Sequence, residues 1–381
     1  MPNPFVYGGR IEDPHHFVGR KAELQYIFDR LEAVAQTGQP QSISVVGPRR
    51  IGKSSLLYHL TQVYRQRLSQ PEAYLCAYLD LESAACQTLS GLLGAALQCL
   101  LKQVQEEKKD RVAQKLHQQL QDIQGGHAVT LVEFEETVKD IGRLPGSRRW
   151  PVLCLDELER LVEEPAQFPP DVYQSWRSLI SANQIIFIVA SMKSLVELAQ
   201  LGGLTSPFFN AFDHTLPPLG ELTPAEAEEL LERGRTCDRP FDDDECRRIL
   251  RLAGYHPWRL QVAGSLVYEA KAGGRAVNWK TVQQRYEQQV KPRLPAQPWP
   301  PTALTRFGQA LRWLGRSPAY PGRLLLLIFN RPATNETDNL VMGYAILIAV
   351  LIVVSLVARG VITRDVVVNL LQWWKWLRGG K

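Results

Sequence analysis

The chain has 381 residues, 45% of them hydrophobic and 22% charged, which excludes a disordered protein and leaves room for two or three folded domains. Its net charge of +5 is mild and spread along the sequence, so charge alone gives little reason to expect a nucleic-acid partner. The six cysteines form no CxxC pair and no cluster with zinc spacing, and we interpret them as reduced, structural thiols that suit a reducing cytosol. The N-terminus lacks the basic start and apolar core of a signal peptide.

In chain order, residues 19–36 have apolar residues at helical spacing and predict the first helix. Short, continuously apolar runs then alternate with helical patterns, as strands buried in a parallel sheet do; these runs are 42–46, 74–81, 151–156 and 185–190. A fifth, weaker run at 214–219 contains prolines, which favour an edge strand. The polar stretch 104–122 predicts a helix with solvated faces. The fold class is therefore α/β.

After Gly220 the pattern becomes all-helical, with helices expected within 222–234, 241–254 and 257–274. Proline-rich sequence follows and indicates a linker. The expected domains are an α/β core at 1–220, a helical lid at 221–290, a linker at 291–339, an apolar segment at 340–358 and an amphipathic tail at 359–381.

Residues 47–54, GPRRIGKS, fit the pattern G-x-x-x-x-G-K-[ST] and lie between an apolar strand and a helical run, as a phosphate-binding loop requires. Gly47 and Gly52 let the backbone turn so that N–H groups point at phosphate oxygens. We expect Lys53 to reach the β- and γ-phosphates and to act in catalysis, and the Ser54 hydroxyl to bind Mg²⁺. The alternative is a glycine-rich corner with an exposed lysine, which this context disfavours.

The strand PVLCL is followed directly by Asp156 and Glu157. Asp156 is expected to hold Mg²⁺, directly or through water, and Glu157 to orient the attacking water and accept its proton. An Asp-Glu pair after a strand is also a common helix N-cap, but the phosphate-binding loop favours the catalytic interpretation. No Asn-Lys-x-Asp motif for guanine is present, so adenine is the expected base.

Five motifs, in this order and spacing, resemble those of the AAA-like, STAND-class P-loop ATPases, and most closely the archaeal and bacterial ATPase group: FVGR (17–20), GPRRIGKSSLL (47–57), LCLDELE (153–159), IIFIVAS (185–191) and GYHP (254–257). The resemblance covers roughly residues 4–290. It implies a P-loop NTPase core with a parallel five-stranded sheet of order 5-1-4-3-2, a small helical lid, and ATP and Mg²⁺ as ligands.

The resemblance also implies roles for individual residues. It places Phe17-Val18-Gly19-Arg20 beside the adenine and makes Ser191 the γ-phosphate sensor, although the family often has a more polar or basic residue there, so Ser191 and Lys193 both stay open. His256-Pro257 matches the lid motif that senses the nucleotide, but His256 also fits a helix start before proline. Arg177 fits a neighbour-sensing arginine or a surface ion pair. The expected nucleotide-binding residues are Gly47, Pro48, Arg49, Arg50, Ile51, Gly52, Lys53, Ser54, Ser55, Val18, Gly19, Arg20, Ser191, His256 and Pro257.

Residues 340–358 carry no charge and are mostly Ile, Leu and Val. As a helix they would extend about 28 Å, close to the roughly 30 Å of a bilayer core, which predicts a transmembrane helix. The alternative is a buried hairpin helix in a soluble lid. The tail 359–381 disfavours that alternative, because its tryptophans beside lysine and arginine suit a lipid headgroup layer.

Binding of ATP requires residues 1–290 to be cytosolic, so a single span would place the tail outside. The basic residues of the tail favour the inside, but long folded domains largely escape that rule. We therefore expect the inner (cytoplasmic) membrane, with the ATPase domain on the cytosolic side and the side of the tail left open.

The leading hypothesis is a membrane-anchored ATPase switch whose nucleotide state controls self-association into a homo-oligomer, with its output at the lipid bilayer in bacterial signalling or defence. One alternative is an ATP-dependent DNA-binding regulator or loader. Residues 291–339 are too short and proline-rich for the winged-helix domain that this needs, so a nucleic-acid partner is not expected. The other alternative is a nucleotide-gated membrane scaffold with negligible turnover, which the presence of Glu157 disfavours. The sequence points to no particular protein partner.

Overall fold

The computed structural model describes residues 3–104, 110–146, 148–201, 207–272 and 276–291, which all belong to the unit Met1–Lys291. None of the helices in these ranges is long and apolar enough to cross a membrane. The predicted membrane span at 340–358 and the predicted tail at 359–381 lie outside the described residues, as does nearly all of the predicted linker.

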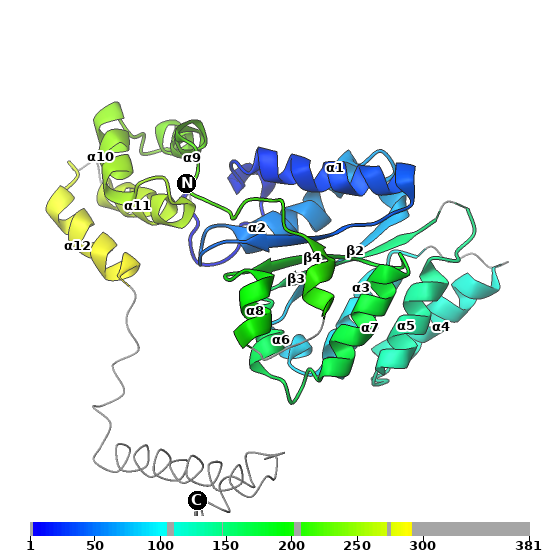
Figure 1. Ribbon diagram of the computed structural model, residues 1–381. Helices are drawn as coiled ribbons and strands as arrows, with labels where there is room; N and C mark the ends of the chain where they lie inside the picture. Colours follow the sequence, from blue (N-terminus) through cyan, green and yellow to red (C-terminus); the bar gives the residue numbers. More distant parts are fainter. Residues whose placement is uncertain (1–2, 105–109, 147, 202–206, 273–275, 292–381) are drawn as a thin grey trace, which may run out of the picture. The chain divides into compact units, whose positions relative to one another are not determined.

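The strands form one parallel five-stranded sheet in the order β2-β3-β4-β1-β5 (Figure 1), which confirms the predicted α/β class and the order 5-1-4-3-2. Every residue of β3 and β4 is buried, as their continuously apolar sequences require. The strands are β1 (Ser42–Val46), β2 (Tyr74–Asp80), β3 (Trp150–Asp156), β4 (Ile186–Ser191) and β5 (Phe212–Asp213).

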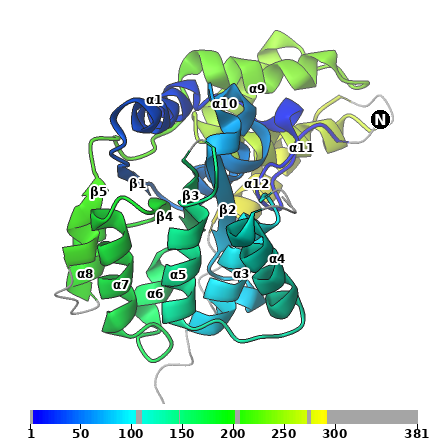
Figure 2. The same ribbon diagram turned by 90° about the vertical axis from the view of Figure 1, so that its right-hand side faces the viewer.

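Helices cover both faces of the sheet (Figures 1 and 2). On β2, Leu75 and Ala77 pack into the core under α3, α4, α5 and α7, whereas Tyr74 and Cys76 pack into the core under α1 and α2. The helices of this part are α1 (Lys21–Thr37), α2 (Lys53–Tyr58), α3 (Leu89–Leu101), α4 (Arg111–Gln124), α5 (Leu131–Ile141), α6 (Glu159–Glu163), α7 (Pro170–Ser181) and α8 (Leu195–Leu201). A π-helical turn, η2 (His59–Val63), continues α2.

The helical lid has a hydrophobic core of its own, to which Phe5 from the N-terminal segment also belongs. Thr223 and Asp242 begin the first two lid helices with capping boxes, in which side chain and backbone satisfy each other's hydrogen bonds. The lid helices are α9 (Pro224–Thr236), α10 (Asp243–Ala253), α11 (Pro257–Ala270) and α12 (Trp279–Val290).

Two differences from the predicted boundaries have a clear physical reason. The first helix begins at Lys21 rather than at residue 19, because Gly19 and Arg20 have left-handed backbone angles, with φ of 73° and 59°. The fifth strand is Phe212–Asp213 rather than 214–219. The prolines of that run lack the N–H that a sheet ladder needs, and only its last residue bonds to β1, through the N–H of Leu219 and the carbonyl oxygen of Val46 at 2.7 Å.

The prediction of a helix solvated on nearly all sides at 104–122 is also wrong where the structure describes that stretch. In α4, Leu116 is fully buried and Leu120 is 8% exposed, both within the core beneath the sheet. They belong to a row of apolar residues at helical spacing, which gives this mostly polar helix one buried face.

Candidate nucleotide site

The loop between β1 and α2 depends on two glycines. Gly52 has a φ of 107°, which favours glycine, and it begins α2. At Gly47 an added Cβ would lie 3.1 Å from the Cβ of Leu219 and 3.2 Å from its carbonyl oxygen, so glycine permits this close approach. The N–H of Gly47 donates to the carbonyl oxygen of Ser191 at 3.0 Å, which fixes the loop against the end of β4.

Lys53 lies folded over this loop. Lys53 is only 4% exposed. Its Nζ donates to the carbonyl oxygens of Gly47 at 2.9 Å and Pro48 at 3.2 Å. Burial lowers the pKa of Lys53, while the carboxylates of Glu157 and Asp156 oppose that shift. The ammonium group is therefore held by weak neutral acceptors that anionic phosphate oxygens can replace.

Asp156 ends β3 and is 2% exposed. Its Oδ1 accepts the backbone N–H of Glu157 at 3.1 Å, and its Oδ2 accepts the hydroxyl of Tyr78 at 2.8 Å. Burial raises the pKa of Asp156, and hydrogen bonds from Ser54 and Tyr78 lower it. Burial also raises the pKa of Tyr78, so this phenol keeps its proton and acts as a donor.

The Ser54 hydroxyl and the Asp156 carboxylate fit a Mg²⁺ site. Both are hard oxygen ligands, and the Ser54 hydroxyl lies near enough to the Asp156 carboxyl group to lower its pKa. Mg²⁺ is usually held by one or two such protein groups together with substrate phosphates and water. Among the described residues there is no cluster of three or more His, Cys, Asp or Glu side chains that would hold a metal alone.

Glu157 has a φ of 55°, an uncommon left-handed conformation for a residue with a side chain. Its side chain is partly buried and lines the same cavity as Lys53 and Ser54. Burial raises the pKa of Glu157, whereas the Lys53 ammonium lowers it. A carboxylate with a raised pKa that faces a cavity is suited to accept a proton from water.

Glu159, the first residue of α6, and Ser191, the last residue of β4, lie beside the site. Glu159 is 7% exposed; its Oε1 accepts the backbone N–H groups of Met192 and of Lys193, the latter at 3.3 Å. Its Oε2 has no hydrogen-bond partner in the described part of the chain. Ser191 is fully buried, and its hydroxyl donates to the Lys193 carbonyl oxygen at 2.6 Å. The structure thus turns the Ser191 hydroxyl toward the loop after β4.

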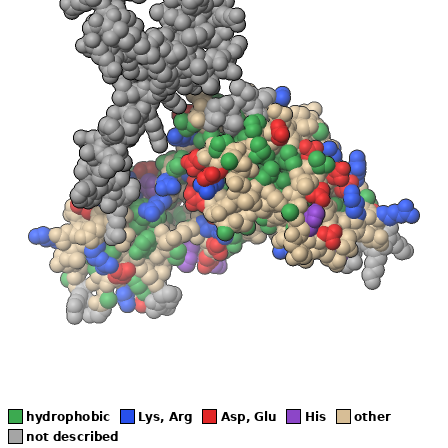
Figure 3. All heavy atoms as spheres, turned by 90° about the horizontal axis from the view of Figure 1, so that it is seen from below, with side chains coloured by type: hydrophobic (Ala, Val, Ile, Leu, Met, Phe, Trp, Pro, Cys, Tyr) green, Lys and Arg blue, Asp and Glu red, His purple; other side chains and the backbone are tan. Residues whose placement is uncertain are grey.

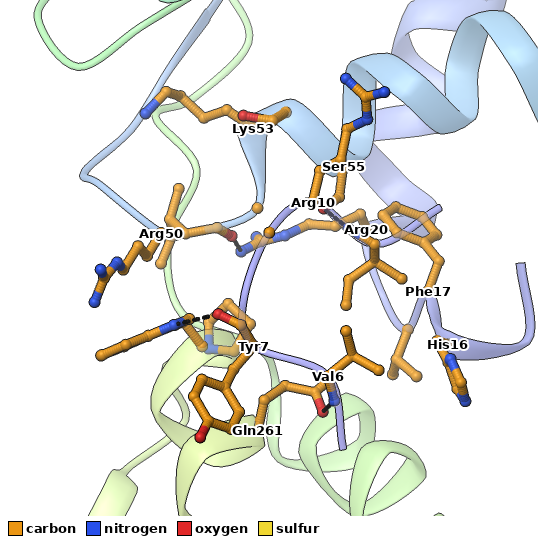
Figure 4. A pocket seen from close by; sticks show the side chains of 18 of the residues that line it. Val6, Tyr7, Arg10, His16, Phe17, Arg20, Arg50, Lys53, Ser55 and Gln261 are labelled. Atoms are coloured by element: carbon orange, nitrogen blue, oxygen red, sulfur yellow. Dashed lines mark hydrogen bonds between the residues drawn. The ribbon is translucent and has the colours of Figure 1, made fainter. Parts of the chain in front are cut away.

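A cavity of about 370 Å³ lies between the loop and the lid, a size that suits a small-molecule ligand. Figure 4 shows part of its lining. The predicted site residues that line the cavity are Phe17, Val18, Arg20, Arg49, Arg50, Ile51, Gly52, Lys53, Ser54, Ser55, Glu157 and Pro257. The predicted site residues outside the lining are Gly19, Gly47, Pro48, Asp156, Ser191 and His256.

Arg20 joins the phosphate-binding loop to the start of the lid. It is 4% exposed, and its guanidinium donates to the carbonyl oxygen of Ile51 at 2.8 Å (Figure 4) and to that of Gly220 at 2.6 Å. It also pairs with Glu23 at 3.0 Å, and its backbone N–H donates to Glu226 of α9 at 3.0 Å. The Arg20 guanidinium therefore binds backbone carbonyl groups, and Arg20 also lines the cavity.

Two further lid residues lie close to the loop. The Arg50 guanidinium lies 4.0 Å from the ring centroid of Trp258 on α11, a cation–π contact between loop and lid. His256 immediately precedes α11, and burial lowers its pKa. Its Nδ1 is buried without a hydrogen-bond partner among the residues that the structure describes.

The N-terminal segment supplies part of the cavity wall that sequence reasoning missed. The N–H of Val6 donates to Gln261 Oε1 at 3.1 Å, and the indole of Trp258 donates to the Tyr7 carbonyl oxygen at 3.0 Å (Figure 4). Further on, the N–H of Ile11 donates to Ser55 Oγ at 2.9 Å. Because this segment has no periodic pattern, the only signal in its sequence was a set of aromatic and glycine residues.

A parallel sheet of this order, with a glycine-rich loop after β1 and an aspartate at the end of β3, defines a P-loop NTPase fold. Residues 16–185 match the family model described as the AAA ATPase domain. No curated protein sequence matches the chain significantly.

Two solved structures have a similar fold. The ORC1 protein of Aeropyrum pernix, solved in complex with DNA, has a TM-score of 0.50 and 15% identity, over 88% of this chain and 78% of that one. The Walker-type ATPase paby2304 of Pyrococcus abyssi has a TM-score of 0.51 and 15% identity, over 88% of this chain and 91% of that one. At this identity the likeness shows the fold alone.

Proposed function

We propose that the chain binds ATP with Mg²⁺ in the cavity between the phosphate-binding loop and the lid, and that it hydrolyses the nucleotide there. The observation that carries this proposal is the convergence of Lys53, Ser54 and Glu157 on one cavity of about 370 Å³. A cation for the phosphates, a hydroxyl for the metal and a base for water are the groups that the reaction needs.

In the proposed reaction, the Lys53 ammonium exchanges its loop carbonyls for β- and γ-phosphate oxygens. Glu157 orients a water molecule and accepts its proton as the water oxygen attacks the γ-phosphorus. The bond from that phosphorus to the β–γ bridging oxygen breaks, which yields ADP and inorganic phosphate. When bound to Ser54 and Asp156, Mg²⁺ would neutralise charge on the phosphate oxygens.

The proposal is tested by phosphate release from ATP with the purified full chain in Mg²⁺. The wild type should release phosphate, and Lys53→Ala should not. Equal phosphate release by both proteins would contradict the assignment of the site.

The proposal includes a switch in which nucleotide state controls lid orientation and self-association. Its support is that Arg20 bonds both Ile51 in the loop and Gly220 before the lid, and that Arg50 contacts Trp258 on α11. The test is the mass of the detergent-solubilised full chain with and without a non-hydrolysable ATP analogue. A mass that does not depend on the analogue would remove the switch by self-association.

We also propose that the switch acts at a membrane, anchored by residues 340–358 with the ATPase domain in the cytosol. The support is the uncharged, aliphatic sequence of that segment and the tryptophans and basic residues after it. The full chain should float with lipid vesicles even in high salt, whereas a chain that ends at residue 339 should not. Equal flotation of the two chains would contradict the anchor.

DNA regulation is the second candidate function, since the fold resembles an ORC1 protein that was solved with DNA. On the face shown in Figure 3, acidic side chains lie among the basic ones. This mixture of charges does not favour binding to the phosphate backbone of DNA. This candidate predicts duplex-DNA binding by the full chain that weakens steeply between about 50 and 200 mM salt. Absence of such binding would remove it.

A further inference from the structure

Tyr78 connects the N-terminal segment to the predicted Mg²⁺ ligand. It lies on β2, which pairs in parallel with β3, and its hydroxyl reaches the Oδ2 of Asp156 at 2.8 Å. The other carboxylate oxygen, Oδ1, accepts the N–H of Glu157 at 3.1 Å. Each oxygen of Asp156 thus accepts a hydrogen bond that restricts rotation of the carboxylate.

Arg10 holds the ring that carries this hydroxyl. Its guanidinium lies 4.9 Å from the centroid of the Tyr78 ring and 4.8 Å from that of Tyr58, and the two rings meet edge to face at 6.2 Å. The Nε of Arg10 also donates to Glu12 at 3.0 Å, which orients the guanidinium plane. Burial alone would lower the pKa of Arg10, but its contacts with Tyr78 and Glu12 raise it, so the group remains a cation.

The backbone on both sides of Arg10 is anchored. Phe5 stacks on Phe241 in the lid core, with ring centroids 5.6 Å apart. On the other side, the Ile11 N–H donates to Ser55 at 2.9 Å, and the Ile11 carbonyl oxygen lies 2.9 Å from His59 Nε2. The segment that carries Arg10 is therefore attached to both the lid and α2, and it holds Arg10 beside Tyr78.

We propose that Tyr78 and Arg10 are positioning residues for Asp156: Tyr78 fixes its carboxylate for Mg²⁺, and Arg10 fixes Tyr78. This inference rests on the proposed binding of ATP with Mg²⁺. Removal of a group that orients a metal ligand typically weakens metal binding by roughly 10–100-fold. Tyr78 is not among the residues that line the nucleotide cavity, whereas Arg10 is, so loss of the Tyr78 hydroxyl should leave nucleotide binding without metal intact.

The test uses the full chain, Mn²⁺ as the metal probe and a non-hydrolysable ATP analogue. Electron paramagnetic resonance gives the affinity for Mn²⁺ in the nucleotide complex, and a separate titration in EDTA gives the affinity for the analogue alone. Tyr78→Phe should weaken Mn²⁺ binding about tenfold and leave the affinity in EDTA unchanged. Arg10→Gln should weaken Mn²⁺ binding roughly two- to fivefold, and Arg10→Lys, which keeps the cation, should weaken it less.

Tyr58→Phe is the matched control. It removes a hydroxyl from the other ring beside Arg10, whereas the hydroxyl that reaches Asp156 is that of Tyr78. An equal loss of affinity in EDTA and in Mn²⁺ for Tyr78→Phe would indicate a general structural defect and overturn the proposal. Normal binding by the wild type with no effect of Tyr78→Phe would overturn this inference alone. Absence of any nucleotide binding by the wild type would overturn the proposed function as well.

Discussion

The Nζ of Lys53 donates to the carbonyl oxygen of Gly47 at 2.9 Å, so the phosphate-binding loop holds its own lysine. The two residues are brought together by the turn that Gly47 and Gly52 permit. A neutral carbonyl is a weaker partner for an ammonium group than a phosphate oxygen, since charge-assisted hydrogen bonds are stronger. The loop is therefore prepared to exchange this contact for a nucleotide.

The first prediction follows from that exchange. Lys53→Ala should raise the dissociation constant for ATP by roughly 10–100-fold, because it removes charged hydrogen bonds to the phosphates. Isothermal titration calorimetry of the full chain measures this change. Lys139→Ala is the control, since Lys139 lies on α5 and its side chain is 43% exposed. Equal ATP affinity in both variants would place the nucleotide elsewhere.

The second prediction concerns Arg20, whose guanidinium bonds the carbonyl oxygens of Ile51 and Gly220. Arg20→Lys should lower the free energy of unfolding by about 1–3 kcal/mol, because an ammonium group cannot reproduce the planar set of donors in this buried position. Denaturant unfolding of the full chain measures the loss. Arg143→Lys, whose native side chain is 71% exposed, should change stability far less. A loss no greater for Arg20→Lys than for this control would contradict the role of Arg20.

The third prediction concerns Glu159, which accepts the N–H groups of Met192 and Lys193 after β4. Glu159→Ala leaves these amides without their acceptor and should cost about 1–3 kcal/mol of unfolding free energy. Hydrogen exchange should show faster exchange at the Met192 and Lys193 amides in this variant. The control is Glu163→Ala, at an exposed position of the same helix, α6. Unchanged protection of both amides would rule out this role.

The fourth prediction concerns pH. Burial alone would raise the pKa of Asp213, but hydrogen bonds from Thr215 and Tyr26 and the charge of Arg30 lower it to about 2. Because the folded pKa lies below the unfolded value of about 3.9, the ionised carboxylate stabilises the fold above that value, and the contribution is lost as pH falls toward 2.

Asp213→Asn should therefore lose less unfolding free energy than the wild type between about pH 5 and pH 2. The difference should be on the order of 1 kcal/mol, since the group is partly screened by solvent. Denaturant unfolding at a series of pH values measures it. Parallel pH profiles for the two proteins would show that Asp213 does not contribute in this way.

The sheet was predictable because its strands are buried on both faces. Residues 42–46 form β1 as predicted, and the predicted strand at 151–156 differs from β3 only by Trp150. The fifth strand was misplaced because β5 has only the residues Phe212 and Asp213, too few for any periodic pattern. Short edge pairing depends on neighbouring elements, here α1, whose Tyr26 donates to Asp213 at 2.5 Å.

The residues of the candidate site likewise include some that the sequence predicted and some that it did not. Lys53, Ser54 and Asp156 were predictable because their chemistry depends on spacing along the chain next to a strand end. Tyr78 was not, since its sequence position in an apolar strand looks like core, and only the pairing of β2 with β3 brings it to Asp156. The contacts of the N-terminal segment with the lid were missed for a similar reason, because they join residues more than two hundred positions apart.

The measurement that tests the central claim most directly is ATP binding and phosphate release by Glu157→Gln in the same preparation. The substitution keeps the size of the side chain but removes the base, so ATP affinity should stay within about twofold while phosphate release falls by roughly 10²–10⁴-fold. Glu163→Gln, an exposed glutamate on α6, is the control and should behave as the wild type. Normal phosphate release by Glu157→Gln would contradict the claim that this carboxylate activates water for ATP hydrolysis.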